Sequence, residues 1–230
     1  MEVRKLDWDS AFFGLRIGRA DVHTAADAAE LASRHNEWQE QFDLLYVFGR
    51  EGVRFTASGA ELVDEKVVYS KRCEPKECYS DVTTYEASMP NEALYRLALV
   101  SGEYSRFRLD KHFPAESYER MYRKWIENAC PKPGSNKQIY VSEQDGKVQG
   151  MITVDYSGEQ AKIGLVAVDP TCQHLGVGSK IMSTLEGMLY HKGVRAIEVA
   201  TQRANTEARR WYEKNGYAVA SITPIYHWWL

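Results

Sequence analysis

Hydrophobic positions follow two periods along this chain, which predicts a protein that mixes helices and strands. In the first third, residues 15–22, 44–48 and 62–71 are short apolar or weakly alternating runs typical of strands. Between the first two runs, Thr24 followed by Asp27 has the spacing of a helix capping pair, so we predict a helix from there to about Gln41. The aromatic and acidic segment 6–14 has no helical period and is predicted to be irregular.

The remaining two thirds predict a second, larger unit. Asn91 is placed to cap a helix, segment 102–110 is predicted as a loop, and Asp145-Gly146 is a strong signal for a two-residue hairpin turn. The predicted helices are 91–98, 117–128, 176–191 and 206–214, and the predicted strands are 79–87, 139–142, 148–156, 161–168, 196–201 and 217–228. We therefore expect an α/β (α+β) protein with a mixed sheet flanked by helices. A smaller α/β domain over 1–78 should precede the main domain over 79–230, joined by the charged segment 71–80.

Composition excludes several classes of function. A net charge of −3 argues against a nucleic-acid partner bound through a broad basic surface. No apolar run reaches the length of a membrane span, and the N-terminus shows no secretory pattern, so we expect a cytoplasmic protein without a membrane partner. The four cysteines lack CxxC spacing, which predicts no metal site and no disulfide framework.

The stretch from Leu165 to Ser179 carries the clearest chemical signal. An apolar strand is stopped by Asp169-Pro170, a loop with Gly176 and Gly178 follows, and an amphipathic helix then begins. Free N–H groups at a helix start, approached closely through glycines, form an anion site. A nicotinamide-binding turn would need a third glycine where Ile181 stands.

The order Gln173-x-x-Gly176-x-Gly178, after a strand ending in Val-Asp-Pro, resembles the coenzyme-A pyrophosphate loop of the GCN5-related N-acetyltransferase (GNAT) family. The resemblance implies acetyl-CoA as cosubstrate, and a strand edge near Val166 that pairs with its pantetheine arm. The residues it implies for coenzyme binding are Val166, Ala167, Val168, Gln173, His174, Leu175, Gly176, Val177, Gly178, Ser179 and Asn205. The family commonly has a basic residue among these glycines; this chain lacks one there, and Lys180 is a candidate substitute.

Asn205 and Tyr212 are seven residues apart, about two helical turns, so they share one helix face. Read from the residues alone, Asn205 caps the helix, Tyr212 packs, and Gly216 ends it. Together with Ala208 and Tyr217, however, they resemble the family signature in which the asparagine contacts the coenzyme and the tyrosine protonates the departing thiolate. Tyr212 is accordingly the predicted catalytic acid.

Segments 6–14, 104–107, 199–202 and 226–229 further resemble the dTDP-fucosamine acetyltransferase subgroup. That resemblance implies direct acetyl transfer, in a ternary complex, to the amine of a dTDP-linked 4-amino-4,6-dideoxyhexose, with the N-terminal domain on the acceptor side. Arg106 and His227 are the predicted substrate-binding residues, against the alternatives of a surface arginine and a packed histidine. Other acceptors (a protein N-terminus, a polyamine or an antibiotic), a non-catalytic coenzyme-binding module, and the choice between monomer and homodimer remain open.

Overall fold

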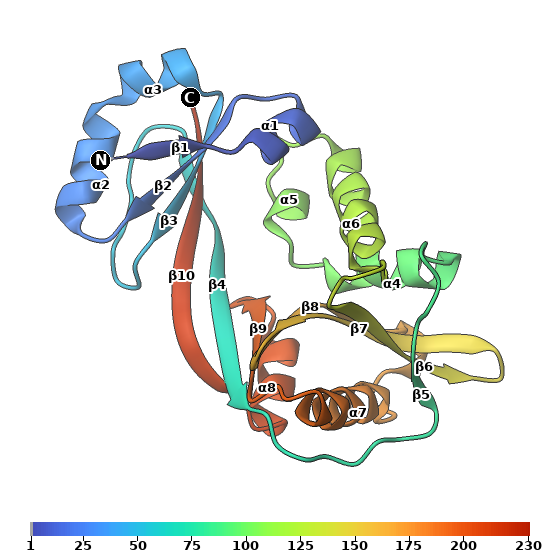
Figure 1. Ribbon diagram of the computed structural model, residues 1–230. Helices are drawn as coiled ribbons and strands as arrows, with labels where there is room; N and C mark the ends of the chain where they lie inside the picture. The colour runs from blue at the N-terminus through green and yellow to red at the C-terminus, as the bar shows by residue number, and fades with distance from the viewer. Residues whose placement is uncertain (1) are drawn as a thin grey trace. The chain divides into compact units, whose positions relative to one another are not determined.

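The computed structural model describes residues 2–230, and its elements are shown in Figure 1. The strands are β1 (Val3–Lys5), β2 (Ile17–Val22), β3 (Leu44–Gly49), β4 (Ala60–Arg72), β5 (Val82–Thr84), β6 (Lys137–Gln144), β7 (Lys147–Ser157), β8 (Gln160–Val168), β9 (Ala196–Gln202) and β10 (Ala218–Trp229). The helices are α1 (Asp7–Phe13), α2 (Ala25–Ser33), α3 (His35–Gln41), α4 (Glu92–Ser101), α5 (Arg106–Leu109), α6 (Ala115–Ala129), the short 3₁₀ turn η1 (Pro170–Cys172), α7 (Val177–His191) and α8 (Thr206–Lys214).

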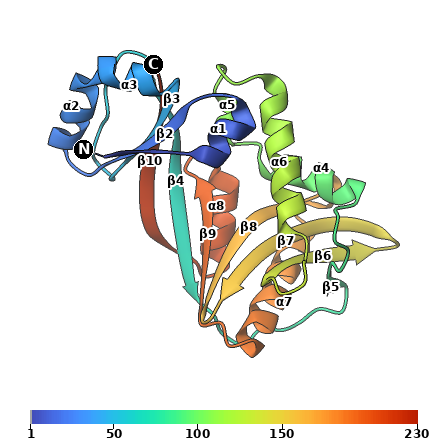
Figure 2. The same cartoon turned by 45° about the horizontal axis from the view of Figure 1, so that its top comes forward.

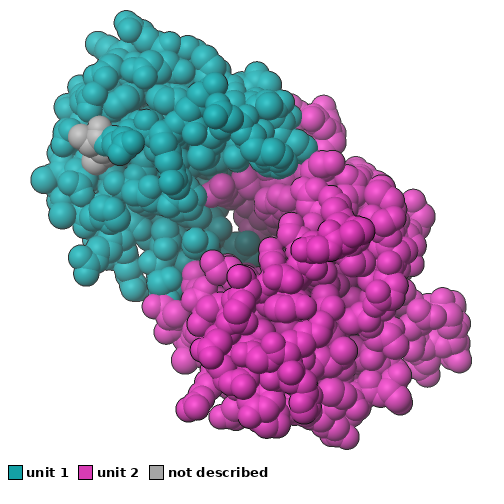
Figure 3. Space-filling model, in the orientation of Figure 1, with its two compact units in different colours: residues 1–67, 201–206, 221–230 teal, residues 68–200, 207–220 magenta. Residues whose placement is uncertain are grey.

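The chain forms two compact units, coloured separately in Figure 3. The first contains the chain up to Val67 with residues 201–206 and 221–230, and the second contains residues 68–200 and 207–220. This division differs from the predicted one at residue 78. The C-terminal strand β10 pairs antiparallel with β3, Ile225 to Trp229 against Phe48 to Leu44, so the last residues complete the sheet of the first unit. A strand's own pattern does not reveal a partner so distant in sequence.

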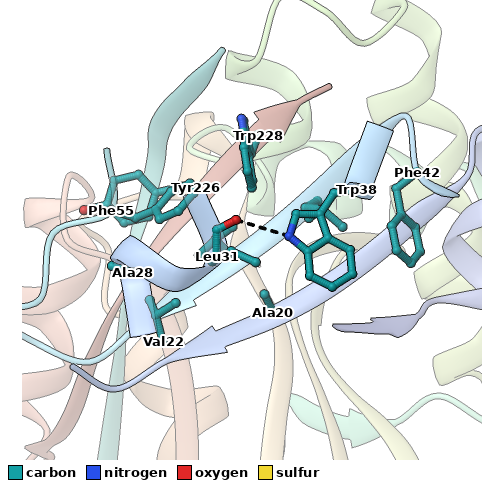
Figure 4. Packing of buried hydrophobic residues seen from close by; sticks show 11 residues of the cluster. Ala20, Val22, Ala28, Leu31, Trp38, Phe42, Phe55, Tyr226 and Trp228 are labelled. Carbon is teal, nitrogen blue, oxygen red and sulfur yellow. Dashed lines mark hydrogen bonds between the residues drawn. The ribbon is translucent and has the colours of Figure 1, made fainter. Parts of the chain in front are cut away.

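The first unit has the strand order β1-β2-β3-β10, followed by residues 60–67 of β4, with β2 and β3 parallel. Helices α2 and α3 supply Leu31 and Trp38 to a core that includes Val47 and Trp228 from the sheet (Figure 4). The predicted capping pair is confirmed, because Thr24 accepts a hydrogen bond from the Asp27 N–H and the Asp27 carboxylate accepts one from Thr24.

Two predictions about this unit were wrong. Segment 6–14 contains helix α1, where Trp8 stacks on Phe12 one turn later at 5.0 Å and Gly14 ends the helix with φ of 70°. The single helix predicted to reach Gln41 is broken at Arg34, which has φ −99° and ψ 27°. There the Trp38 indole donates to the Leu31 carbonyl at 3.2 Å, a tertiary contact that stabilises the turn between two helices (Figure 4).

The second unit contains strands in the order β9-β8-β7-β6-β5. Helices α4 and α6 cover one face of β6, β7 and β8, and α7 covers the opposite face (Figures 1 and 2). The Asp145-Gly146 turn is confirmed, since both residues have positive φ, 52° and 73°, as a type I′ hairpin requires. Asn91 caps α4 by accepting from the Leu94 N–H at 2.9 Å. Segment 102–110, predicted to be a loop, contains the short helix α5, which Ser105 caps.

Candidate functional site

Strand β8 carries a β-bulge in its middle. Ile152 of β7 pairs with Val166 and Val154 pairs with Ile163, so Thr153 alone faces both Gly164 and Leu165. The Thr153 side chain is buried, and its hydroxyl oxygen accepts a hydrogen bond of 2.7 Å from the Leu165 N–H. We did not foresee Thr153; the available signal was Gly164, because an isolated glycine inside a strand marks a bulge.

Beyond the bulge, the edge of β8 that faces β9 has no paired strand within residues 2–230. The pairing of β8 with β9 ends at Ile163 and Val199. The N–H groups of Leu165 and Asp169 both bond toward β7. Successive residues of a strand direct their backbone groups to opposite edges, so those of Val166 and Val168 point away from β7. Of the three residues of β8 predicted to bind the coenzyme, Val166 and Val168 therefore have their backbone groups at the open edge. The backbone groups of Ala167 face β7.

The loop after β8 is fixed by Asp169. Its carboxylate accepts from the Thr171 N–H at 3.0 Å and from the Thr171 hydroxyl at 2.7 Å, and it forms an ion pair of 3.0 Å with Arg96. The hydrogen bonds from Thr171, followed by the charge of Arg96, hold the pKa of Asp169 below its ordinary value. The end of β8 therefore has a defined direction into η1 and the glycine loop.

Helix α7 begins without a side-chain cap. Its N-cap residue is Gly176, with φ of 83°, and the first backbone bond of the helix runs from the Lys180 N–H to the Gly176 carbonyl. The N–H groups of Val177, Gly178 and Ser179 precede that bond and are left without helical acceptors. Predicted loop residues Gln173, His174 and Leu175 lead into this point, with His174 at φ 61°. This is the backbone geometry that an anion site at a helix start requires.

Gly178 lies where β8, α7 and α8 meet. A Cβ atom on Gly178 would be 3.3 Å from the Trp211 ring and 3.4 Å from the Val168 side chain. The Trp211 indole also donates to the Ser179 hydroxyl at 3.3 Å. Trp211 thus ties α8 to the start of α7, a role that the sequence motif did not reveal.

Tyr212, the next residue on α8, is 4% exposed and packs against three aromatic rings: Trp211 at 5.0 Å, Tyr69 at 5.6 Å and Tyr217 at 5.9 Å. Among residues 2–230 its hydroxyl makes no hydrogen bond to another protein group. Burial, and secondarily the nearby Tyr69, raise the pKa of Tyr212 above its ordinary value. The side chain is therefore tightly packed, and its hydroxyl keeps its proton at neutral pH.

The ends of α8 follow the prediction. The helix begins directly after Asn205, which belongs to the first compact unit. At its other end the Gly216 N–H bonds to the Glu213 carbonyl and the Tyr217 N–H to the Tyr212 carbonyl, with Gly216 at φ 82°. These two bonds define a Schellman motif.

Lys180, the candidate substitute for the missing basic loop residue, lies on the first turn of α7. Its ammonium group forms a partly exposed ion pair of 3.0 Å with Asp81. His174, which is exposed, lies 4.0 Å from the Glu207 carboxylate. The loop therefore offers mainly backbone donors to an anion.

The two predicted substrate-binding residues have different surroundings. Arg106, on α5 of the second unit, is half-buried with its guanidinium 4.7 Å from the centre of the Phe107 ring. His227, on β10 in the first unit, is fully buried and stacks on Tyr46 at 4.9 Å. This burial favours the packing interpretation of His227 over a role in substrate binding.

Within the described residues, no group of three or more histidine, cysteine or acidic side chains is arranged to hold a metal ion. None of the helices in residues 2–230 combines the length and apolar character needed to cross a membrane.

Comparison with known proteins gives consistent matches. The model of the acetyltransferase (GNAT) family matches residues 74–217. The chain is 27% identical to a dTDP-fucosamine acetyltransferase of Escherichia coli O6:H1, over 95% of this chain and 94% of that protein. Its fold is similar to a functionally unknown conserved protein of Staphylococcus epidermidis (TM-score 0.62, 14% identity, 99% of this chain and 90% of the other). It is also similar to a GCN5-related N-acetyltransferase of Sphaerobacter thermophilus (TM-score 0.61, 16% identity, 98% and 75%).

Proposed function

The chain belongs to the GNAT family of acetyltransferases, and from this premise we propose that it acetylates the amine of a nucleotide-linked amino sugar of the dTDP-4-amino-4,6-dideoxyhexose type. The observation that carries the acetyltransferase chemistry is the open edge of β8, which leads into the uncapped start of α7. The observation that favours an amino sugar is the similarity to dTDP-fucosamine acetyltransferase, which extends over 95% of this chain, including the N-terminal unit.

The coenzyme of this family, acetyl-CoA, supplies the acetyl group as a thioester. The N–H groups of Val177, Gly178 and Ser179 fit its pyrophosphate, because they converge at a helix start without a competing side-chain acceptor. The free backbone groups of Val166 and Val168 fit the amides of the pantetheine arm, which would extend the sheet as an added strand. Asn205 is proposed to contact the coenzyme at the start of α8.

Val166 and Tyr212 supply the chemistry in this proposal. The Val166 N–H donates to the thioester carbonyl oxygen and stabilises the negative charge that develops there as the amine attacks. The Tyr212 hydroxyl gives its proton to the departing sulfur, a role suited to a phenol that burial keeps protonated. The sugar amine attacks directly and must be neutral to do so. The attacking nitrogen loses one proton as the amide forms; we assign no protein base, so this proton goes to solvent.

The acceptor's charged part is proposed to lie near Arg106, since a guanidinium binds phosphate oxygens well. The test is a turnover assay that follows release of free coenzyme A thiol from acetyl-CoA. The panel contains a dTDP-4-amino-4,6-dideoxyhexose, the same nucleotide sugar with a hydroxyl in place of the amine, a polyamine and a peptide with a free N-terminus.

We expect acetyl-CoA-dependent turnover with the amino sugar and none with its hydroxyl analogue. Turnover confined to the polyamine or the peptide would reject the amino-sugar assignment and leave the acetyltransferase activity in place. Binding of acetyl-CoA without turnover of any amine would support a non-catalytic module instead.

A further inference from the structure

A cavity of about 460 Å³ opens beside the β8 bulge, between the sheet and α6. Trp125 of α6, Val154 of β7 and Leu165 of β8 give it apolar walls, and Gly164 of the bulge lines it without a side chain. This volume lies within the range of about 300–1,000 Å³ usual for small-ligand sites. We call it the bulge cavity.

Trp125 is the aromatic wall of the bulge cavity. Its ring is half-buried and packs against Tyr122 at 4.8 Å and Phe107 at 6.3 Å, so it is held in place from behind. A rigid, partly accessible indole binds flat apolar surfaces at little entropic cost. The CH-bearing face of a sugar ring is such a surface.

One side of the bulge cavity has a row of alternating charges. Lys137 on β6 pairs in register with Asp155 on β7, and Asp155 pairs with Lys162 on β8. Asp155 and Lys162 are exposed, and Lys137 donates to the Asn128 carbonyl at 3.1 Å. The row presents hydrogen-bond donors and acceptors next to the apolar wall. A sugar ring requires both kinds of surface, because its face is apolar and its edge carries hydroxyl groups.

The position of the bulge cavity relates it to the reaction. Gly164, which lines the bulge cavity, is two residues before Val166, the proposed donor to the thioester carbonyl. Because Gly164 has no side chain, it does not separate the cavity from Val166. We infer that the bulge cavity binds the 4-amino-4,6-dideoxyhexose ring of the acceptor. Trp125 covers the apolar face of the ring, the row of Asp155 and Lys162 binds its hydroxyls, and the amine points toward Gly164. This inference rests on the proposed function.

The experiment measures KM separately for the amino sugar and for acetyl-CoA. Trp125→Ala removes the aromatic wall, and Trp125→Phe retains it. Asp155→Asn removes one charge of the row at an exposed position where folding is not at risk. Asp145→Asn, at the exposed hairpin turn that joins β6 to β7, is its matched control.

We expect Trp125→Ala and Asp155→Asn each to raise KM for the amino sugar roughly 3- to 10-fold. Trp125→Phe should raise it less than Trp125→Ala does, because an aromatic ring remains. Asp145→Asn should stay within about 2-fold of wild type, as should KM for acetyl-CoA in all four variants. If the wild-type protein acetylates the amino sugar while Asp155→Asn and any folded Trp125→Ala retain normal KM values, the cavity assignment is overturned and the proposed function stands. If the wild-type protein acetylates no amino sugar, the proposed function fails and this inference fails with it.

Discussion

The hydroxyl of Thr153 accepts a hydrogen bond of 2.7 Å from the backbone N–H of Leu165, across the one point where β7 and β8 are out of register. This contact satisfies a donor that the bulge would otherwise leave without a strand partner. The next residue, Val166, is the first whose backbone groups lie at the open edge of β8. A side chain of β7 therefore stabilises the irregularity on which the open edge of β8 depends.

Replacing Thr153 by Val should impair use of the coenzyme. Valine has a similar shape but no acceptor, and an unsatisfied N–H group at this site costs about 1–3 kcal/mol. The local backbone is expected to shift, raising KM for acetyl-CoA and lowering kcat. Thr153→Ser keeps the hydroxyl and should retain most activity. Normal kinetics in Thr153→Val would show that the bulge does not need this hydrogen bond.

Gly176→Val should weaken acetyl-CoA binding by at least about 10-fold, because a β-branched residue is strained at φ 83° and would displace the start of α7. Gly134 is a matched control: it also has positive φ, 76°, and open space around its Cα, and it lies in the connection between α6 and β6. Gly134→Val should show similar loss of thermal stability with unchanged affinity. Equal affinities in both variants, measured by calorimetry, would reject the loop as the pyrophosphate site.

Tyr212→Phe keeps the packed ring and removes the hydroxyl. Turnover should fall about 10²–10⁴-fold while acetyl-CoA affinity changes little, as for an interaction made chiefly in the transition state. Tyr140→Phe, which removes a buried hydroxyl bonded to Gln138 on β6, should leave turnover nearly normal. A Tyr212→Phe variant with more than about half of wild-type turnover, with chemistry rate-limiting, would show that Tyr212 only packs.

The pH profile gives a separate check on Tyr212. Because burial raises its pKa above the ordinary value of about 10, the hydroxyl stays protonated through the neutral and mildly alkaline range. Wild-type turnover should therefore show no alkaline decline from this residue below about pH 10. A decline near pH 8 that disappears in Tyr212→Phe would contradict this assignment.

Asp43 contributes stability to the first unit through Arg16. Its carboxylate accepts from the Arg16 N–H at 2.7 Å and pairs with the guanidinium at 2.7 Å, which lowers its pKa. This contribution is present above the unfolded pKa of about 3.9 and is lost as pH falls through the lower folded pKa. Asp43 is 37% exposed, so solvent screening limits the expected loss in Asp43→Asn to about 1 kcal/mol at pH 7. Urea unfolding at pH 7 and pH 3 measures it; an equal loss at both pH values would contradict the charge-based account.

The sequence by itself determined features whose causes are local. The stop at Asp169-Pro170, the left-handed Gly176 and the amphipathic period of α7 all act within a few residues, and together they determined the strand, loop and helix of the candidate coenzyme site. The Asp145-Gly146 hairpin, the cap at Asn91 and the stop at Gly216 were predictable for the same reason. In each case the backbone conformation depends on the residue that adopts it.

Only the tertiary structure decided features that depend on residues far apart in sequence. These are the pairing of β10 with β3, the contact of Thr153 with Leu165, the bond from Trp211 to Ser179 and the pairing of Lys180 with Asp81. The hydrophobic period of a strand is the same whichever strand lies beside it, and a charge in the sequence does not name its partner. The open edge of β8 is such a feature, because it is defined by where the pairing of two strands ends.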